Sequence, residues 1–104
     1  MITDGFEWND RKNAANLSKH AIDFRDVRRA FDAPLVRSPD RRMDYGETRW
    51  IAIGRIDSQI VVIVYVHRGD RIRLISARKA SRREREQYRR HVGHGLGPSG
   101  PDDR

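Results

Sequence analysis

The chain has 104 residues, of which 37% are apolar, and a formal net charge of +7. This length suits one domain with a single modest core. The absence of cysteine excludes disulfides and thiolate-ligated zinc. The chain holds no apolar run long enough to span a bilayer and no signal-peptide pattern at its start. We therefore expect a cytoplasmic protein that does not associate with membranes.

The positive charge is concentrated between Arg68 and Arg90. This stretch holds ten basic residues against three acidic ones, so its net charge of +7 equals that of the whole chain. Nine of the ten are arginines, whose planar guanidinium groups suit the oxygens of phosphate. The pattern indicates a polyanionic ligand, above all nucleic acid. The ten residues are Arg68, Arg71, Arg73, Arg78, Lys79, Arg82, Arg83, Arg85, Arg89 and Arg90.

A short strand within residues 2–8 is predicted to precede the first helix. That helix begins at Asn9 or Asp10, either of which can cap it, and runs to about His20.

A second helix is predicted after Asp23, which provides its amino-terminal cap. Phe24, Val27 and Phe31 recur at helical spacing, so this face should be buried. Pro34 ends the helix.

The middle of the chain predicts a sheet. A short strand over 35–37 lies within an irregular, proline-containing stretch, and longer apolar strands cover 49–55, 60–66 and 71–79. The connections between the three long strands are short, and Gly69 with Asp70 fits a two-residue hairpin turn. These three strands should therefore form an antiparallel meander.

The last helix begins with a capping box made by Ser81 and Glu84 and continues until Gly93. We expect one domain over residues 1–92 and a glycine- and proline-rich disordered tail over 93–104. The predicted class is α+β: two N-terminal helices, an antiparallel sheet formed by a three-strand meander plus one short N-terminal-side strand, and a C-terminal helix.

Three segments of the chain resemble the BrnT toxin family. They are F-E-W-N-D-R-K-N-A-A-N-L-S-K-H, G-E-T-R-W-I-A-I-G-R and I-R-L-I-S-A-R-K-A-S-R-R-E-R-E-Q-Y, which together cover roughly residues 6–90. The resemblance implies a RelE-like fold and a ribonuclease toxin of a type II toxin–antitoxin system. It also implies a BrnA-type antitoxin that neutralises the toxin and binds operator DNA, so that the pair represses its own transcription.

The sequence departs from the family pattern at two positions. Ala21 stands where glycine is common, so we expect the first helix to end without a left-handed cap. Asn9 stands where aspartate is common, which still permits capping.

RNA can be cleaved without a metal when its 2′-hydroxyl attacks the adjacent phosphate. Such a site must position the backbone, stabilise charge on the phosphoryl oxygens and move two protons. We assign Arg49, Arg73, Arg78 and Lys79 to the phosphate. Strand alternation places Arg73 and Lys79 on one face and Arg78 on the other, unless a bulge at Ile75 intervenes. The structural alternative is that these are solvated charges at strand edges.

Proton transfer has two candidate residues. Glu47 adjoins Arg49, and it either acts as a base or holds Arg49 by a salt bridge. Tyr88 either contacts phosphate or a base, or belongs to the core as the aromatic residue of the last helix.

Five further arginines are expected to follow the RNA or rRNA backbone. The alternatives are an exposed polar helix face and a docking surface for an acidic antitoxin segment. The five are Arg71, Arg82, Arg83, Arg85 and Arg89.

Metal and histidine chemistry are weakly supported. Asp40, Asp44 and Glu47 form only a loose set of candidate Mg²⁺ ligands in a loop, so we expect neither metal nor cofactor. His20, at a helix carboxyl terminus, has a structural interpretation, and His67 is a fallback acid or base.

Two functions follow from the residues. The first is a metal-independent endoribonuclease toxin that acts on RNA or on ribosome-bound message and blocks translation. It would reach operator DNA only through its antitoxin. The second is a basic module that binds RNA, DNA or the ribosome, or acts as a corepressor, without any catalysis, because every arginine named could equally be a phosphate anchor.

Overall fold

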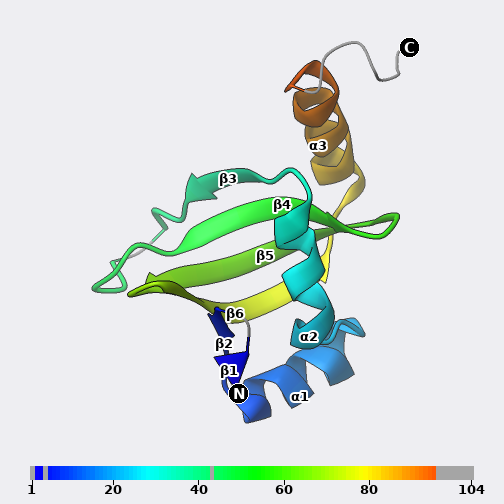
Figure 1. Ribbon diagram of the computed structural model, residues 1–104. Coiled ribbons are helices and arrows are strands. Elements are labelled where there is room, and N and C mark those ends of the chain that lie inside the picture. Colours follow the sequence, from blue (N-terminus) through cyan, green and yellow to red (C-terminus); the bar gives the residue numbers. More distant parts are fainter. Residues whose placement is uncertain (1, 4, 43, 96–104) are drawn as a thin grey trace.

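The computed structural model describes residues 2–3, 5–42 and 44–95, and Figure 1 shows how their helices and strands are arranged. The elements in chain order are β1 (Ile2–Thr3), β2 (Phe6–Glu7), α1 (Asp10–His20), α2 (Phe24–Val27), the 3₁₀ helix η1 (Arg28–Asp32), β3 (Val36–Pro39), β4 (Trp50–Ile56), β5 (Gln59–Arg68), β6 (Arg71–Lys79) and α3 (Arg82–Gly95).

All six strands belong to one sheet with the order β1-β2-β6-β5-β4-β3. The predicted meander is confirmed, because β4, β5 and β6 pair antiparallel in sequence order. The α+β class is confirmed as well. The expected strand inventory was wrong, since β3 extends the sheet beside β4 and the amino-terminal segment forms two strands, β1 and β2.

The sheet is also mixed rather than wholly antiparallel, because β2 pairs parallel with β6. Residues 8–70 separate these two strands, so no local signal marks the pairing. Parallel neighbours need a long crossover, and here the helices and the meander provide it.

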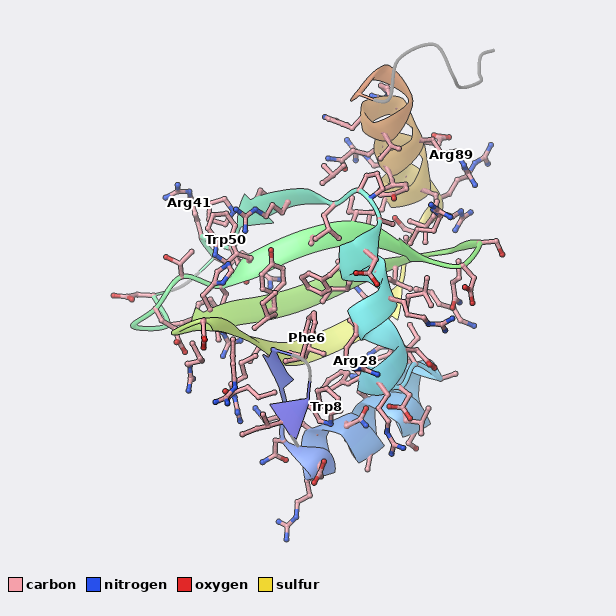
Figure 2. The ribbon with its side chains drawn as sticks, in the orientation of Figure 1. Phe6, Trp8, Arg28, Arg41, Trp50 and Arg89 are labelled. Atoms are coloured by element: carbon pink, nitrogen blue, oxygen red, sulfur yellow. The ribbon has the colours of Figure 1, made fainter. Side chains whose placement is uncertain are left out.

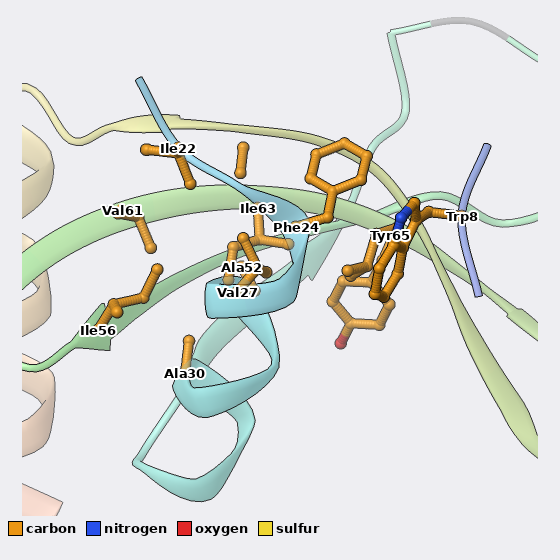
Figure 3. Packing of buried hydrophobic residues seen from close by; sticks show 12 residues of the cluster. Trp8, Ile22, Phe24, Val27, Ala30, Ala52, Ile56, Val61, Ile63 and Tyr65 are labelled. Atoms are coloured by element: carbon orange, nitrogen blue, oxygen red, sulfur yellow. The ribbon is translucent and has the colours of Figure 1, made fainter. Parts of the chain in front are cut away.

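Helices cover both sides of the sheet. On one side α2 and η1 pack over a core that includes Phe24, Val27, Ile63 and Tyr65 (Figure 3), and α1 lies against β6 on the same side. On the other side α3 contributes Tyr88 to a smaller cluster with residues of β4 and β5. We call these two surfaces the α1–α2 side and the α3 side.

The amino-terminal helix has the predicted start and a different end. Asn9 accepts a hydrogen bond from the backbone N–H of Lys12 at 3.0 Å, which confirms the cap. Ala21 adopts the left-handed conformation with φ of 60°, and its N–H donates to the carbonyl of Leu17. The expectation that this helix lacks a left-handed cap was therefore wrong. Alanine takes the conformation that glycine adopts more easily.

Two buried asparagines, which the sequence analysis did not single out, hold the turn after α1. Asn13 accepts from the N–H of Phe24 at 2.8 Å. Asn16 donates to the carbonyl of Ile22 at 3.0 Å and accepts from the N–H of Ala77 at 3.1 Å. These bonds fix α1 to the start of α2 and to β6, and they satisfy polar groups that burial would otherwise destabilise.

Several predicted boundaries shift. The second helix is α-helical only over Phe24–Val27 and continues as the 3₁₀ helix η1, and the strand expected at 35–37 is Val36–Pro39. Helix α3 passes the expected stop at Gly93 and reaches Gly95. The rest of the predicted tail, residues 96–104, lies outside the described residues. No helix of the described part has the length and apolar character needed to cross a bilayer.

Candidate functional site: the arginines of the α3 side

A bulge in β6 decides which arginines share a surface. Val64 pairs with Ser76 and Tyr65 pairs with Leu74, so Ile75 is an extra residue in β6. In a regular strand, two residues five apart lie on opposite sides of the sheet. The extra residue in β6 therefore places Arg73 and Arg78 on the same side. This is the outcome that the sequence analysis made conditional on a bulge at Ile75.

The register places that shared surface on the α3 side. Arg78 pairs with Val62, which packs with α3, and Arg73 pairs with Val66, two strand repeats further along β5. Lys79 pairs instead with Val61, a residue of the α1–α2 core. The expectation that Arg73 and Lys79 share a face was therefore wrong.

Three further arginines lie on the same side: one precedes β4, one ends β5 and one begins β6. Arg49 immediately precedes β4, two residues before Ile51, which packs toward α3. Arg68 follows Val66 by one strand repeat and pairs with Arg71 across the hairpin of Gly69, which has a φ of 61°. The five arginines of the α3 side are Arg49, Arg68, Arg71, Arg73 and Arg78.

Two of these arginines hold carboxylates from neighbouring elements, β2 and α3. Arg73 donates to Glu7 of β2 at 2.8 Å, and their side chains are 28% and 17% exposed. Arg78 donates through both terminal nitrogens to Glu84 of α3, each at 2.8 Å. The hydrogen bonds from Arg78, together with those from Ser81, lower the pKa of Glu84 to about 2. Glu84 also completes the predicted capping box with Ser81, which is confirmed.

Glu47 has a partner other than the expected one. Its two oxygens accept from Arg68 at 3.2 Å each, so the salt bridge with neighbouring Arg49 that the sequence suggested is replaced by one to the end of β5. The side chains of Arg68 and Glu47 are 48% and 39% exposed. A pair this exposed contributes little to stability.

Arg49 is bound differently from the others. Its guanidinium carbon lies 3.9 Å from the centroid of the Tyr45 ring, which is a cation–π contact. Its Nε is buried and has no hydrogen-bond partner in the described part of the chain. Within residues 2–3, 5–42 and 44–95, no carboxylate forms an ion pair with it.

The loop before β4 contains a cluster of polar side chains around Asp40. From the sequence, Asp40 belonged only to a loose set of candidate Mg²⁺ ligands. Asp40, whose side chain is 1% exposed, accepts from Arg42 at 2.9 and 2.8 Å and from the Tyr45 hydroxyl at 3.1 Å. The bonds from Arg42, and then that from Tyr45, hold the pKa of Asp40 well below its ordinary range. No three acidic or histidine side chains of the described residues converge as metal ligands.

The charge of Arg42 also acts on Arg78 of the α3 side. The pKa of Arg78 is raised, mainly by its hydrogen bonds to Glu84, and the positive charge of Arg42 opposes that rise. The two guanidinium groups are therefore close enough to interact. An arginine in an irregular loop gives no sequence signal of such proximity.

The other predicted residues lie apart from this cluster. Tyr88 is 3% exposed, and its hydroxyl donates to the carbonyl of Pro34 at 2.9 Å, which matches the core alternative rather than a phosphate contact. His67 pairs with Ile72 and packs edge-on against Tyr65, on the α1–α2 side. Tyr88 thus belongs to the small core under α3, and His67 lies on the opposite side of the sheet from the five arginines.

The arginines of α3 are mostly exposed. Arg82 lies 3.8 Å from Glu86 with 88% of its side chain exposed, and Arg85 donates to the carbonyl of Ala80. Arg83 and Arg89 are exposed as well, and Figure 2 shows Arg89 projecting from the helix.

A family model described as the ribonuclease toxin BrnT of type II toxin–antitoxin systems matches residues 8–84. The chain belongs to the BrnT family. A comparison with curated proteins gave no match. The matched span contains Arg49, Arg73, Arg78 and Glu84, whereas Glu7 and most of α3 lie outside it. Membership in a toxin–antitoxin family implies an antitoxin partner for this BrnT chain.

Proposed function

We propose that this BrnT protein is a metal-independent endoribonuclease with a RelE-like arrangement, whose phosphate site is the α3 side of the sheet. The observation that carries the proposal is the bulge that brings Arg73 and Arg78 to one surface with Arg49. Guanidinium groups from β6 and from the residue before β4 can bind RNA phosphate and stabilise the charge that develops on it. Lys79, on the opposite side, is left out of this set.

The proposed reaction is attack of the RNA 2′-oxygen on the adjacent phosphorus. The new bond to the 2′-oxygen forms as the bond to the 5′-oxygen breaks, which leaves a 2′,3′-cyclic phosphate and a free 5′-hydroxyl. Glu47 is the proposed base for the 2′-proton, and Arg68 holds both of its oxygens. The leaving oxygen takes its proton from water, because Tyr88 is buried and His67 lies on the other side.

We further propose that the partner is a BrnA-type antitoxin that neutralises the toxin and represses the operon, so that the toxin reaches operator DNA only through it. Five arginines would follow the RNA backbone, free or on the ribosome: the exposed Arg71, Arg82, Arg83 and Arg89, and the half-buried Arg85. Blocked translation in the cytoplasm would be the result.

The test is cleavage of RNA by the purified toxin in EDTA. We expect cyclic phosphate ends, and we expect the double variant R49A/R78A to lose most activity, about a hundredfold or more. Arg29, which pairs with Asp26 and Asp57 away from these arginines, provides the matched control R29A, which should cleave normally. Intact RNA, or cleavage unchanged in the double variant, would contradict the mechanism.

One observation favours a second candidate, a binding module without catalysis. Each carboxylate beside the arginines of the α3 side, Glu7, Glu47 or Glu84, already forms an ion pair with one of them, so none is free to accept a proton without giving up that pair. Such a module would bind RNA with a steep salt dependence and yield no cyclic phosphate product. Product analysis therefore separates the two functions.

A further inference from the structure

Arg49 differs from its neighbours in what balances its charge. Arg68, Arg73 and Arg78 each donate to a carboxylate, whereas Arg49 stacks on the ring of Tyr45. A carboxylate neutralises a guanidinium group and occupies its N–H donors. An aromatic ring contacts only the flat face of the group, so the positive charge and the terminal N–H donors stay available to an anion, while the buried Nε does not.

The ring that supports Arg49 is itself held by Asp40. The Tyr45 hydroxyl donates to Oδ2 of Asp40 at 3.1 Å, and the backbone N–H of Asp40 donates to the carbonyl of Arg49 at 2.7 Å. Arg42 binds both carboxylate oxygens and so fixes their orientation. The Asp40 side chain is almost fully buried, which leaves it little freedom to move.

We infer that Tyr45 is a positioning residue for the RNA-cleaving site, which holds Arg49 in place through its ring while Asp40 fixes the ring. This inference rests on the proposed function, because it assigns Tyr45 a role through a phosphate-binding arginine. A guanidinium group fixed before the substrate arrives stabilises transition-state charge without reorganisation. A freely rotating Arg49 would lose part of that benefit.

The test measures cleavage by Y45L in two backgrounds, wild type and R49A. If Tyr45 acts through Arg49, Y45L lowers kcat about tenfold in the wild-type background, a loss typical of a cation–π contact. In the R49A background the same substitution should change kcat less than about twofold, because the group it positions is gone. A purely structural role would produce equal losses in both backgrounds.

A second variant keeps the test decisive if Y45L does not fold. Y45F retains the ring and loses the hydrogen bond to Asp40, so we expect a smaller loss in kcat, about threefold, and a broadened Arg49 Nε–H signal in NMR spectra. The matched control is Y65F, which removes a hydroxyl that accepts from Arg37 on the α1–α2 side. Y65F should leave both cleavage and the Arg49 signal unchanged.

The outcomes separate this inference from the proposed function. Normal cleavage by R49A would overturn the role of Arg49 and, with it, the positioning role of Tyr45, but it would leave the endoribonuclease function standing. Reduced cleavage by R49A with unchanged cleavage by Y45L and Y45F would overturn only the positioning role. Equal effects of Y45L with and without Arg49 would also overturn it.

Discussion

Most arginines of the α3 side are engaged before any RNA is bound. Glu7, Glu47 and Glu84 each occupy one of them, so an RNA phosphate must either displace a carboxylate or add to the pair. Arg49 faces no such competition, since it rests on Tyr45. At the scale of single residues, therefore, Arg49 before β4 is a partly buried charge of this surface that aromatic stacking supports and no carboxylate of the described residues occupies.

A single residue also carries backbone strain. Ala21 has φ of 60° and is exposed, so no packing requires its methyl group. The left-handed conformation costs alanine roughly 1–2 kcal/mol, and glycine recovers part of that at the expense of greater freedom in the unfolded chain. We expect A21G to raise the free energy of unfolding by about 0.5–1 kcal/mol in urea titrations. The control A15G, within α1, should lower the free energy of unfolding. A lower free energy of unfolding for A21G would show that the backbone at Ala21 is not strained.

Individual elements were predictable where their signals are local. The caps at Asn9 and Asp23 and the Ser81–Glu84 box depend on residues within one turn, and each forms as expected. The side of the sheet on which Arg78 lies depends on the bulge in β6. The apolar residue Ile75 interrupts the strand alternation and so suggests a bulge, but the sequence alone does not establish that one forms. The pairing of β2 with β6 and the contact of Tyr45 with Arg49 arise only in the folded chain, because the packing of other elements determines them.

The start of α3 should respond to acid. Glu84 has its pKa lowered to about 2 from 4.5, chiefly by Arg78, so its stabilising contribution is complete above pH 4.5 and is lost as the pH falls toward 2. We expect E84Q to reduce the free energy of unfolding by about 1 kcal/mol at pH 7, after allowance for solvent screening. Near pH 2 the two proteins should be equally stable.

The control for this pH dependence is E86Q on the same helix. Glu86 is 53% exposed and lies 3.8 Å from Arg82, so its loss should change stability little at any pH. Denaturant titrations from pH 2 to 7 make the comparison. A constant difference between E84Q and the wild-type protein across this range would contradict the assignment.

At the scale of the whole molecule, two basic regions meet around the same surface. The arginines of the α3 side come from the sheet, and α3 adds an exposed basic helix that rises from the end of β6 in Figure 1. The carboxylates lie among the sheet arginines, whereas Arg83 and Arg89 are exposed on the helix. We therefore expect the sheet to determine chemistry and the helix to determine affinity.

R89A tests this division of roles. Removing one phosphate contact should weaken RNA binding about threefold. The slope of the logarithm of the RNA association constant against the logarithm of the salt concentration should become shallower by about 0.7, the value for one phosphate of a single strand. KM should rise while kcat stays unchanged, because the contact is equally strong in the ground and transition states. Arg25 on α2 is also exposed to solvent but lies on the other side of the sheet from α3, and R25A should alter neither constant. A fall in kcat for R89A, matching that of R49A, would place the helix within the reacting site, and the separation of chemistry from affinity would then be wrong.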